Sequence, residues 1–418
     1  MSVISVDSRS PLSCEWLVVG MIAVSALGIF CFCSVRHYLM RSGAFDLGFF
    51  DQVIFLISRG QPPISSLLGF HVLGDHASLI LYPLALFYLI WPNVHMLLAI
   101  QAIAMSAGAW PIWRLGIGAG LTKRQALAVA AAYLMYPIVL TASIFDFHPD
   151  ALVVPALLMA ILAARENKRV AFCIWIAVAL SCKEVISLPV IAMGIWLLFS
   201  ERRRFFGSVA IVAGAVWFVI ATQWIIPHFG NGRAPSGTRF YSYLGSSVGQ
   251  IIFTMFRHPE TVLAHIFAAA TAIYLLPIVV PVIWGLNRRA IAPLLGALPI
   301  ILLNVISQSS AQRSIFSQYS LPIVPFVFTA VIAALAMDRA WLRRGRAIVA
   351  WSIALFCLAF VVRIRRVQSQ YAMDWEGISQ THSAIRQIGP SGKVLTTFES
   401  VPHLSHRAGV QYIGNQYI

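Results

Sequence analysis

Charged side chains are scarce in this sequence. Only 11% of its 418 residues are Asp, Glu, Lys or Arg, whereas 59% are hydrophobic. Because a soluble domain has about 25% charged residues, this composition excludes an ordinary soluble protein. Long apolar runs of helical length recur along the whole chain, as expected of a polytopic membrane protein. Ten-residue segments of alternating hydrophobicity are absent, which argues against a membrane β-barrel.

Acidic residues are scarcer than basic ones, with 15 Asp and Glu against 30 Lys and Arg. The basic residues lie in short clusters between apolar runs, as in cytoplasmic loops, so the net charge of +15 does not indicate nucleic-acid binding. Cysteines are also few and lack paired spacing, which indicates neither a disulfide framework nor a zinc site. They are Cys14, Cys31, Cys33, Cys173, Cys182 and Cys357.

Eleven apolar runs are candidates for spanning helices, although several are shorter than the roughly 20 residues of a full crossing. The first is too long for a signal-peptide core and lacks a clear small-residue cleavage site, so we expect a retained helix. A further run, 78–92, either crosses the membrane or lies at its interface. The eleven runs are 15–35, 93–115, 124–143, 150–164, 170–182, 185–200, 206–227, 263–286, 290–307, 320–338 and 346–363.

Basic residues decide between the two positions of 78–92. If this run does not cross, all five basic clusters fall on one face, which is then cytoplasmic. If it crosses, the first cluster is separated from the other four. We therefore predict an all-α membrane protein with about eleven crossings (10–13), a cytoplasmic N-terminus and an extracytoplasmic C-terminus. The clusters are Arg114/Lys123/Arg124, Arg165/Lys168/Arg169, Arg202–Arg204, Arg288/Arg289 and Arg339/Arg343/Arg344/Arg346.

This topology predicts two parts of unequal size. Residues 1–363 form the transmembrane domain, in which the outer loop 36–92 carries interfacial helices. Residues 364–418 form a short extracytoplasmic tail, with a turn, a short strand and a loop, that packs on the outer face. No internal repeat is visible, so the sequence gives no support to an inverted-repeat transporter.

The outer loop contains "GAFDLGFFDQ", in which Asp46 and Asp51 interrupt an aromatic stretch, followed by Asp75 and His76. One interpretation is an amphipathic interfacial segment whose phenylalanines are buried among headgroups while the aspartates stay hydrated. The other is a carboxylate held at the membrane surface as a general base. Either Asp46 or Asp51 could be that base.

The segment "DFHPD" places Asp146, His148 and Asp150 at the start of a predicted helix. Pro149 is favoured in the first turn, and a carboxylate there is stabilised by the helix dipole, so Pro149 and Asp150 suit a structural cap. A cap does not explain Asp146 or His148. Two carboxylates that flank an imidazole could bind a divalent metal or orient a proton-transfer group.

"SCKEVISLP" places Lys183 and Glu184 between two apolar runs. They either pair with one another at a helix end, or Lys183 binds a lipid phosphate with Glu184 as its partner or as a metal ligand. Arg239 and Arg313 lie in polar loops and are further candidates for phosphate binding, although exposed arginines are often merely solvated. His403 and His406 in "VPHLSHR" are weak metal candidates.

Several segments occur in an order that resembles a bacterial family of predicted membrane proteins, the domain of unknown function 2079. The resemblance begins near residue 36 and continues to the end of the chain. This family is grouped with the GT-C glycosyltransferases, which are membrane enzymes that use lipid-phosphate-linked sugars. The segments are "FDLGFFDQ", "DFHPDALVVPALL", "KE", "YLGSS", "YLLPIVVPVIW", "QYSLPIVPF" and "PHLSHR".

The resemblance implies a GT-C-like bundle in the bacterial inner membrane. It implies that Asp46, with Asp51 as the alternative, acts as base or metal ligand, and that "DFHPD" supplies a second acidic motif on the same face. The donor would be a polyprenyl-phosphate sugar held in contact with membrane lipid, and the acceptor a hydroxyl of a glycan, lipid or protein. Lys183, Arg313 and Arg239 would bind the phosphate, and a divalent metal (Mg, Mn or Zn) is a candidate cofactor on Asp146, His148, Asp150 or Glu184.

Two features depart from the family pattern. Val185 follows "KE" where a further acid is expected, and the sequence ends soon after "PHLSHR", so we expect no longer outer domain. The competing function is a transporter or flippase for a lipid-linked or amphipathic molecule, and a non-catalytic scaffold is a third possibility. Transport predicts ionisable residues near the bilayer midplane, whereas the notable charges here are predicted at one rim, which favours surface chemistry.

Overall fold

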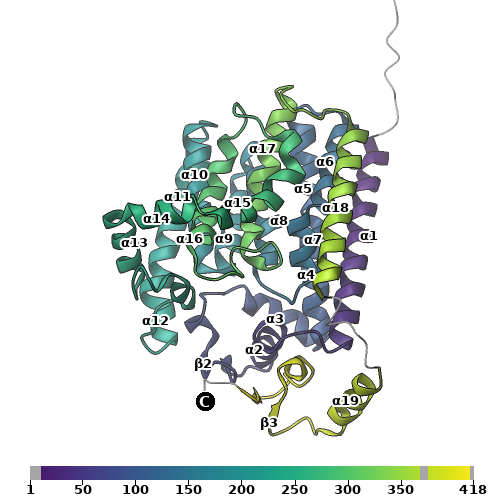
Figure 1. The fold of residues 1–418 in the computed structure, drawn as a ribbon, viewed down its shortest axis with the longest axis vertical. Coiled ribbons are helices and arrows are strands. Elements are labelled where there is room, and N and C mark those ends of the chain that lie inside the picture. The colour runs from purple at the N-terminus through teal and green to yellow at the C-terminus, as the bar shows by residue number, and fades with distance from the viewer. Residues whose placement is uncertain (1–10, 368–374, 415–418) are drawn as a thin grey trace, which may run out of the picture.

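The computed structural model describes residues 11–367 and 375–414, which form a helical bundle with a smaller module at one end (Figure 1). The bundle contains α1 (Pro11–Tyr38), α4 (Val94–Ala107), α5 (Ala109–Gly118), α6 (Lys123–Leu134), α7 (Pro137–Ser143), α8 (Asp150–Arg165), α9 (Arg169–Cys182), α10 (Ser187–Phe199), α11 (Arg204–Ile220), α12 (Ile226–Phe229), α15 (Ala269–Val279), α16 (Leu298–Ile306), α17 (Val324–Ala336) and α18 (Gly345–Val367). Helices α13 (Val248–Arg257) and α14 (Pro259–Ile266) project from its side.

The end module combines the outer loop with the tail. It contains α2 (Phe49–Ser58), the antiparallel strands β1 (Ile64–Ser65) and β2 (Phe70–His71), and α3 (Leu81–Ile90). The tail adds α19 (Trp375–Gln387) and the parallel strands β3 (Lys393–Thr396) and β4 (Gly409–Tyr412). Ser66 joins the two parts, because its hydroxyl donates to the Val410 carbonyl at 2.7 Å and accepts from the Val410 N–H at 2.9 Å.

Helix length explains where 78–92 lies. Helix α3 has 10 residues and packs on α2 in the end module (Figure 1). At 1.5 Å per residue it is about 15 Å long, half the roughly 30 Å of a bilayer core. This run is therefore too short to cross by itself.

Five described helices are long and apolar enough to span a membrane, and the number rises to seven if two bent pairs count as single spans. Several of the predicted runs form shorter helices, among them Arg169–Cys182 and Ala292–Ile306. The buried share is only 11% in the α1 and α18 spans but 83% in the α17 span, so α1 and α18 present most of their surface to lipid. The eleven-crossing count stays a prediction.

Two predicted continuous helices are broken. The run 124–143 bends by 44° between α6 and α7, because Pro137 lacks an N–H and forces Tyr136 out of the helical region, with ψ at 128°. The run 263–286 bends by 55° between α14 and α15, where Ala268 is extended.

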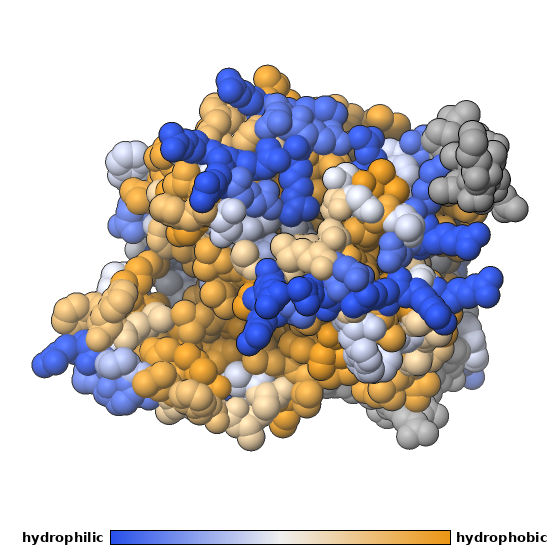
Figure 2. Space-filling model, turned by 90° about the horizontal axis from the view of Figure 1, so that it is seen from above, coloured by the Kyte–Doolittle hydropathy of each residue, from blue (hydrophilic) through white to orange (hydrophobic). Residues whose placement is uncertain are grey.

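The five basic clusters meet at the end of the bundle opposite the module. The Gln125 amide donates to the Arg343 carbonyl at 3.0 Å, and Arg203 donates to the Ala164 carbonyl at 2.7 Å. Asn287 likewise bonds the Arg339 carbonyl at 3.3 Å. Figure 2 shows the hydrophilic side chains gathered over this end. The shared face is as expected, and its cytoplasmic orientation remains a prediction.

Helices α10 and α11 pack closely because glycines face each other. A Cβ on Gly194 would lie 2.8 Å from the Gly207 carbonyl oxygen, and one on Gly207 would lie 2.7 Å from that of Gly194. Small residues allow such close approach between membrane helices.

Gly194→Ala and Gly28→Ala should therefore differ in their effects on the free energy of unfolding. We expect Gly194→Ala to lower the free energy of unfolding by about 1–3 kcal/mol through overpacking. Gly28 lies in α1 with nothing within 4 Å of its Cβ position, so alanine there should be neutral or stabilising. Thermal unfolding in detergent measures both, and equal effects would contradict the close crossing.

Candidate active site

Two adjoining cavities meet at the end module: apart from His76 the first is lined by residues outside the module, and the second is lined by residues of both bundle and module. The first, about 360 Å³, is mostly apolar and is lined by side chains such as Leu188, Phe218 and Ile251. The second, about 250 Å³, contains Asp46 and His148 between the aromatic rings of Phe45, Phe49 and Phe50. Four residues line both cavities and mark their junction: His76, Lys183, Arg239 and Tyr319.

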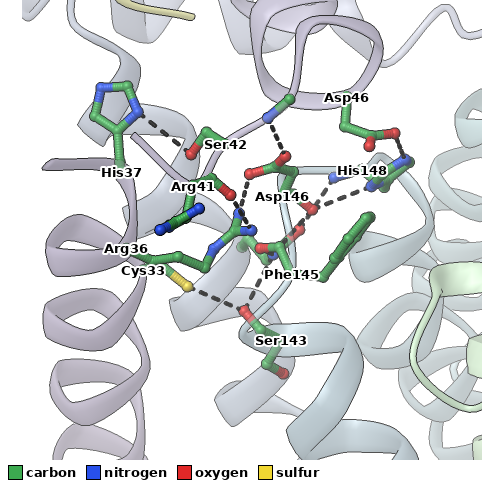
Figure 3. A network of polar contacts seen from close by, with 12 residues as sticks. Cys33, Arg36, His37, Arg41, Ser42, Asp46, Ser143, Phe145, Asp146 and His148 are labelled. Atoms are coloured by element: carbon green, nitrogen blue, oxygen red, sulfur yellow. Dashed lines mark hydrogen bonds and ion pairs between the residues drawn. The ribbon is translucent and has the colours of Figure 1, made fainter. Parts of the chain in front are cut away.

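Asp46 faces the second cavity from a π-helical turn, Ala44–Gly48. Its Oδ1 lies 3.0 Å from Nε2 of His148, and its side chain is 31% exposed (Figure 3). The sequence separates these two residues widely, so only the fold shows that the two predicted acidic motifs meet. Asp46 is thus a carboxylate that keeps access to the cavity while an imidazole fixes one of its oxygens.

His148 is held on all sides. Its Nδ1 lies 3.1 Å from the Asp146 carbonyl, its backbone N–H donates to Gln101 Oε1 at 3.0 Å, and the Phe145 ring stacks on it. Burial lowers the pKa of His148, but the bond to Asp46 and the charges of Asp46 and Asp150 outweigh burial and raise the pKa above its ordinary value. A protonated His148 donates both ring N–H groups, one to Asp46 and one to the carbonyl.

Asp146 is a structural residue in this arrangement. Its carboxylate forms an ion pair with Arg36 at the end of α1 and accepts the Gly43 N–H at 2.8 Å (Figure 3). Arg36 also donates to the Arg41 carbonyl at 2.8 Å. These bonds tie α1 and the start of the outer loop to the segment that carries His148.

Lys183 lies where α9 ends. The chain is extended there, with φ at −167°, and the Ser78 hydroxyl and Ile80 N–H bond the last carbonyls of α9. Lys183 Nζ lies 3.4 Å from Asp150 Oδ2 and 5.8 Å from the centre of the Tyr319 ring. Asp150 therefore both begins α8 and partners the buried lysine.

Glu184 partners a histidine instead of Lys183. Its two oxygens lie 2.9 and 3.1 Å from Nδ1 of His76. Nε2 of His76 lies 3.9 Å from Asp75 Oδ2, which is beyond hydrogen-bonding distance. Asp75 and His76, which sequence analysis left without a role, both line the second cavity.

Asp51 lies outside both cavities. Its side chain is fully buried, with an exposed fraction of 0%, and bonds the hydroxyls of Tyr88 and Ser405. Nε2 of His406 completes the set at 3.0 Å. Asp51 thus anchors the tail to α2 and α3, whereas Asp46 faces open space.

The remaining predicted residues divide between the junction and other places. Arg239 lines both cavities and has no acidic partner among the described residues. Arg313 lines neither cavity, so the structure does not bring it to the junction. His403 stacks on His37 at 3.9 Å between ring centroids, within the contact between tail and bundle.

The tentative metal ligands do not form one donor set. Asp146 is paired with Arg36, Asp150 with Lys183 and Glu184 with His76. Within 11–367 and 375–414, no three His, Cys, Asp or Glu side chains are grouped to hold a metal ion. The described residues therefore do not fit a divalent cation.

Sequence analysis missed Tyr319 as a site residue. Its only signal was its position in "QYSLPIVPF", a segment used for the resemblance but given no role. It also missed the aromatic wall of Phe45, Phe49 and Phe50, rings that one of its two interpretations buried among headgroups. Gln101, which fixes the His148 backbone, lies inside an apolar run that showed no polar pattern.

The contact between tail and bundle should weaken in acid. Burial, with the nearby His382, lowers the pKa of His403 to about 4. The docked tail therefore binds fewer protons than the released tail, so its docking is fully stable above about pH 6.5 and weakens as the pH falls towards 4.

Hydrogen exchange of residues 393–412, corrected for intrinsic rates, should show this loss between pH 7.5 and 4.5. His403→Phe keeps a ring against His37 but cannot titrate, so its protection should depend less on pH. An unchanged pH dependence in this variant would remove His403 as the cause.

Comparisons with known proteins agree with this fold. The crystal structure of ArnT from Cupriavidus metallidurans in the apo state superimposes with a TM-score of 0.56 at 14% identity, covering 96% of this chain and 86% of that one. The same enzyme bound to undecaprenyl phosphate gives a TM-score of 0.52 over the same shares of both chains, also at 14% identity. This likeness shows a polytopic GT-C fold. No curated protein matches the sequence.

The family comparison covers nearly the whole chain. A model of the family DUF2079, described as a predicted membrane protein, matches residues 36–418. These residues include the outer loop, all of the cavity-lining segments and the tail. The chain therefore belongs to the DUF2079 family of predicted membrane proteins.

Proposed function

We propose that this protein is a membrane glycosyltransferase that moves a sugar from a polyprenyl-phosphate donor to an acceptor hydroxyl on the extracytoplasmic face. One observation carries the proposal: an apolar cavity and a polar cavity meet at two cations, Lys183 and Arg239. An amphiphile with an apolar chain, an anionic group and a polar head fits this order of surfaces.

The donor's position follows from the lining of the cavities. A prenyl chain would lie in the apolar cavity against Leu188, Phe218 and Ile251. Its phosphate would lie at the junction, where Lys183 neutralises charge and the guanidinium of Arg239 can donate two hydrogen bonds. The undecaprenyl phosphate bound to the similar ArnT supports a lipid phosphate as the ligand.

The sugar would then extend into the polar cavity beside Asp46. Asp46 takes the proton of the acceptor hydroxyl, whose oxygen attacks the anomeric carbon from the face opposite the phosphate. The bond from that carbon to the phosphate oxygen breaks, and polyprenyl phosphate leaves. His148 holds Asp46 in place, so orientation and general-base catalysis both contribute.

The charges do not favour transport. Asp46, Lys183 and Arg239 all line the polar cavity, where Asp46 comes from the outer loop and Lys183 from the end of α9. A transporter would place such residues near the midplane between broken helices. Surface chemistry on a membrane lipid is the function that this placement supports.

The test uses purified protein in lipid nanodiscs with radiolabelled polyprenyl-phosphate hexoses and pentoses, and cell-envelope extract as acceptor. We expect label to leave the lipid fraction, and Lys183→Ala to prevent this. Lys168→Ala, at the basic end, is the matched control, because it removes an exposed lysine far from the cavities. Proteoliposomes that move the intact labelled lipid between leaflets without cleaving it would overturn the proposal in favour of a flippase.

A further inference from the structure

A second carboxylate–imidazole pair faces the candidate active site, and it differs from the first in one respect. In the Asp46–His148 pair both imidazole nitrogens are engaged, one by the carboxylate and one by a backbone carbonyl. In the Glu184–His76 pair the carboxylate engages Nδ1 alone. Within the described residues, Nε2 of His76 makes no hydrogen bond, since Asp75 Oδ2 is 3.9 Å away.

The two pairs also differ in which ring nitrogen and which carboxylate are available. Glu184 is buried and accepts from Nδ1, so it fixes the ring with Nε2 turned away from the carboxylate, and the ring donates from Nε2 when both nitrogens carry a proton. Asp46 has a side chain that is 31% exposed, whereas the His148 side chain is only 7% exposed and has both ring nitrogens engaged. The first pair therefore presents a carboxylate, and the second presents an imidazole N–H.

The positions match the two ends of a displacement reaction. His76 lines both cavities at the junction with Lys183 and Arg239, where the donor phosphate is expected. Asp46 lines only the polar cavity, where the acceptor is expected. A base beside the attacking oxygen and an acid beside the leaving oxygen is the arrangement that general acid–base catalysis requires.

We propose that His76, oriented by Glu184, is the general acid that protonates the departing polyprenyl phosphate. This inference rests on the proposed function. The acceptor proton passes to Asp46 as the new bond to the anomeric carbon forms. The electron pair of the breaking bond remains on the phosphate oxygen, and the Nε2 proton of His76 passes to the phosphate. Solvent then returns a proton from Asp46 to His76, so no net proton is consumed.

The test compares pH–rate profiles for transfer from the labelled donor. An acid that must be protonated gives the wild type an alkaline limb, in which kcat falls as the pH rises. His76→Gln should lower kcat by about 10²–10⁴-fold, remove that limb and change KM only a few-fold. Glu184→Gln keeps the imidazole but removes its charge partner, so the limb should move to lower pH.

The surface supplies a matched control. His258 Nδ1 lies 2.9 Å from Glu260 Oε1 in a pair that is exposed and outside both cavities. His258→Gln should leave rate and profile unchanged. If His76 only binds the phosphate, His76→Gln will raise KM while the alkaline limb persists, and the acid role is overturned. If wild-type protein transfers no sugar at all, the proposed function itself fails, so the two failures are distinguishable.

Discussion

Asp46→Asn is expected to lower the sugar-transfer rate by about 10²–10⁴-fold, the usual contribution of a general base. Asparagine has nearly the same shape and can still accept a hydrogen bond from His148, 3.0 Å away. It cannot take a proton from the acceptor hydroxyl. Donor binding should be nearly unchanged, so the loss should fall on kcat.

Two other aspartates make this measurement specific. Asp51→Asn disturbs a buried site with three polar partners. It should therefore lower the thermal unfolding temperature while leaving the transfer rate per folded molecule nearly unchanged. Asp338→Asn lies at the exposed basic end and should change neither quantity. Full activity in Asp46→Asn together with loss in Asp51→Asn would reassign the base to Asp51.

Arg36→Met should destabilise the protein by about 3–5 kcal/mol, the cost of leaving one member of a buried ion pair without its partner. Asp146 would keep only the Gly43 N–H in a region that excludes water. The segment that carries His148 would lose its tie to α1, so transfer activity should fall with stability. Chemical or thermal unfolding in detergent measures the effect.

An exposed pair provides the comparison. Arg343 bonds Asp338 at 2.7 Å, with both side chains at least half exposed, so Arg343→Met should cost about 0–1 kcal/mol. The double variant Arg36→Met/Asp146→Leu should recover much of the lost stability, because no charge is then left buried. Equal effects of Arg36→Met and Arg343→Met would show that the buried pair is not a stability determinant.

Much of the fold could be predicted from the sequence because hydrocarbon length and basic loops are local properties. The helical runs and the shared end of the basic clusters follow from them. The bend at Tyr136 could also have been predicted, because the residue before a proline is disfavoured in the helical conformation and Pro137 is visible in the sequence. The bend at Ala268 has no such marker.

The site was only partly predictable because its pairings are long-range. Asp46, His148, Lys183 and His76 were all candidates, since ionisable residues are conspicuous in an apolar chain. Their partners were not predictable: Arg36 directly follows the first apolar run, 15–35, and was given no role, yet it takes Asp146 out of the candidate metal set. Nothing in the local sequence distinguishes Asp46 from Asp51. They differ in exposure, which is set by residues distant in the sequence that bury Asp51 and leave Asp46 open to the cavity.

The contact between Ser405 and Asp51 also restricts how the chain can be threaded through the bilayer. Two segments that touch must be on one side, so the number of crossings between residues 51 and 405 must be even. An odd number of spans inserted between them during synthesis would leave the two residues on opposite sides of the bilayer, and the Asp51 carboxylate would lack the Ser405 hydroxyl as a partner. The Ser405–Asp51 contact can therefore form only if the number of inserted spans between these residues is even, and only after the last span has been inserted.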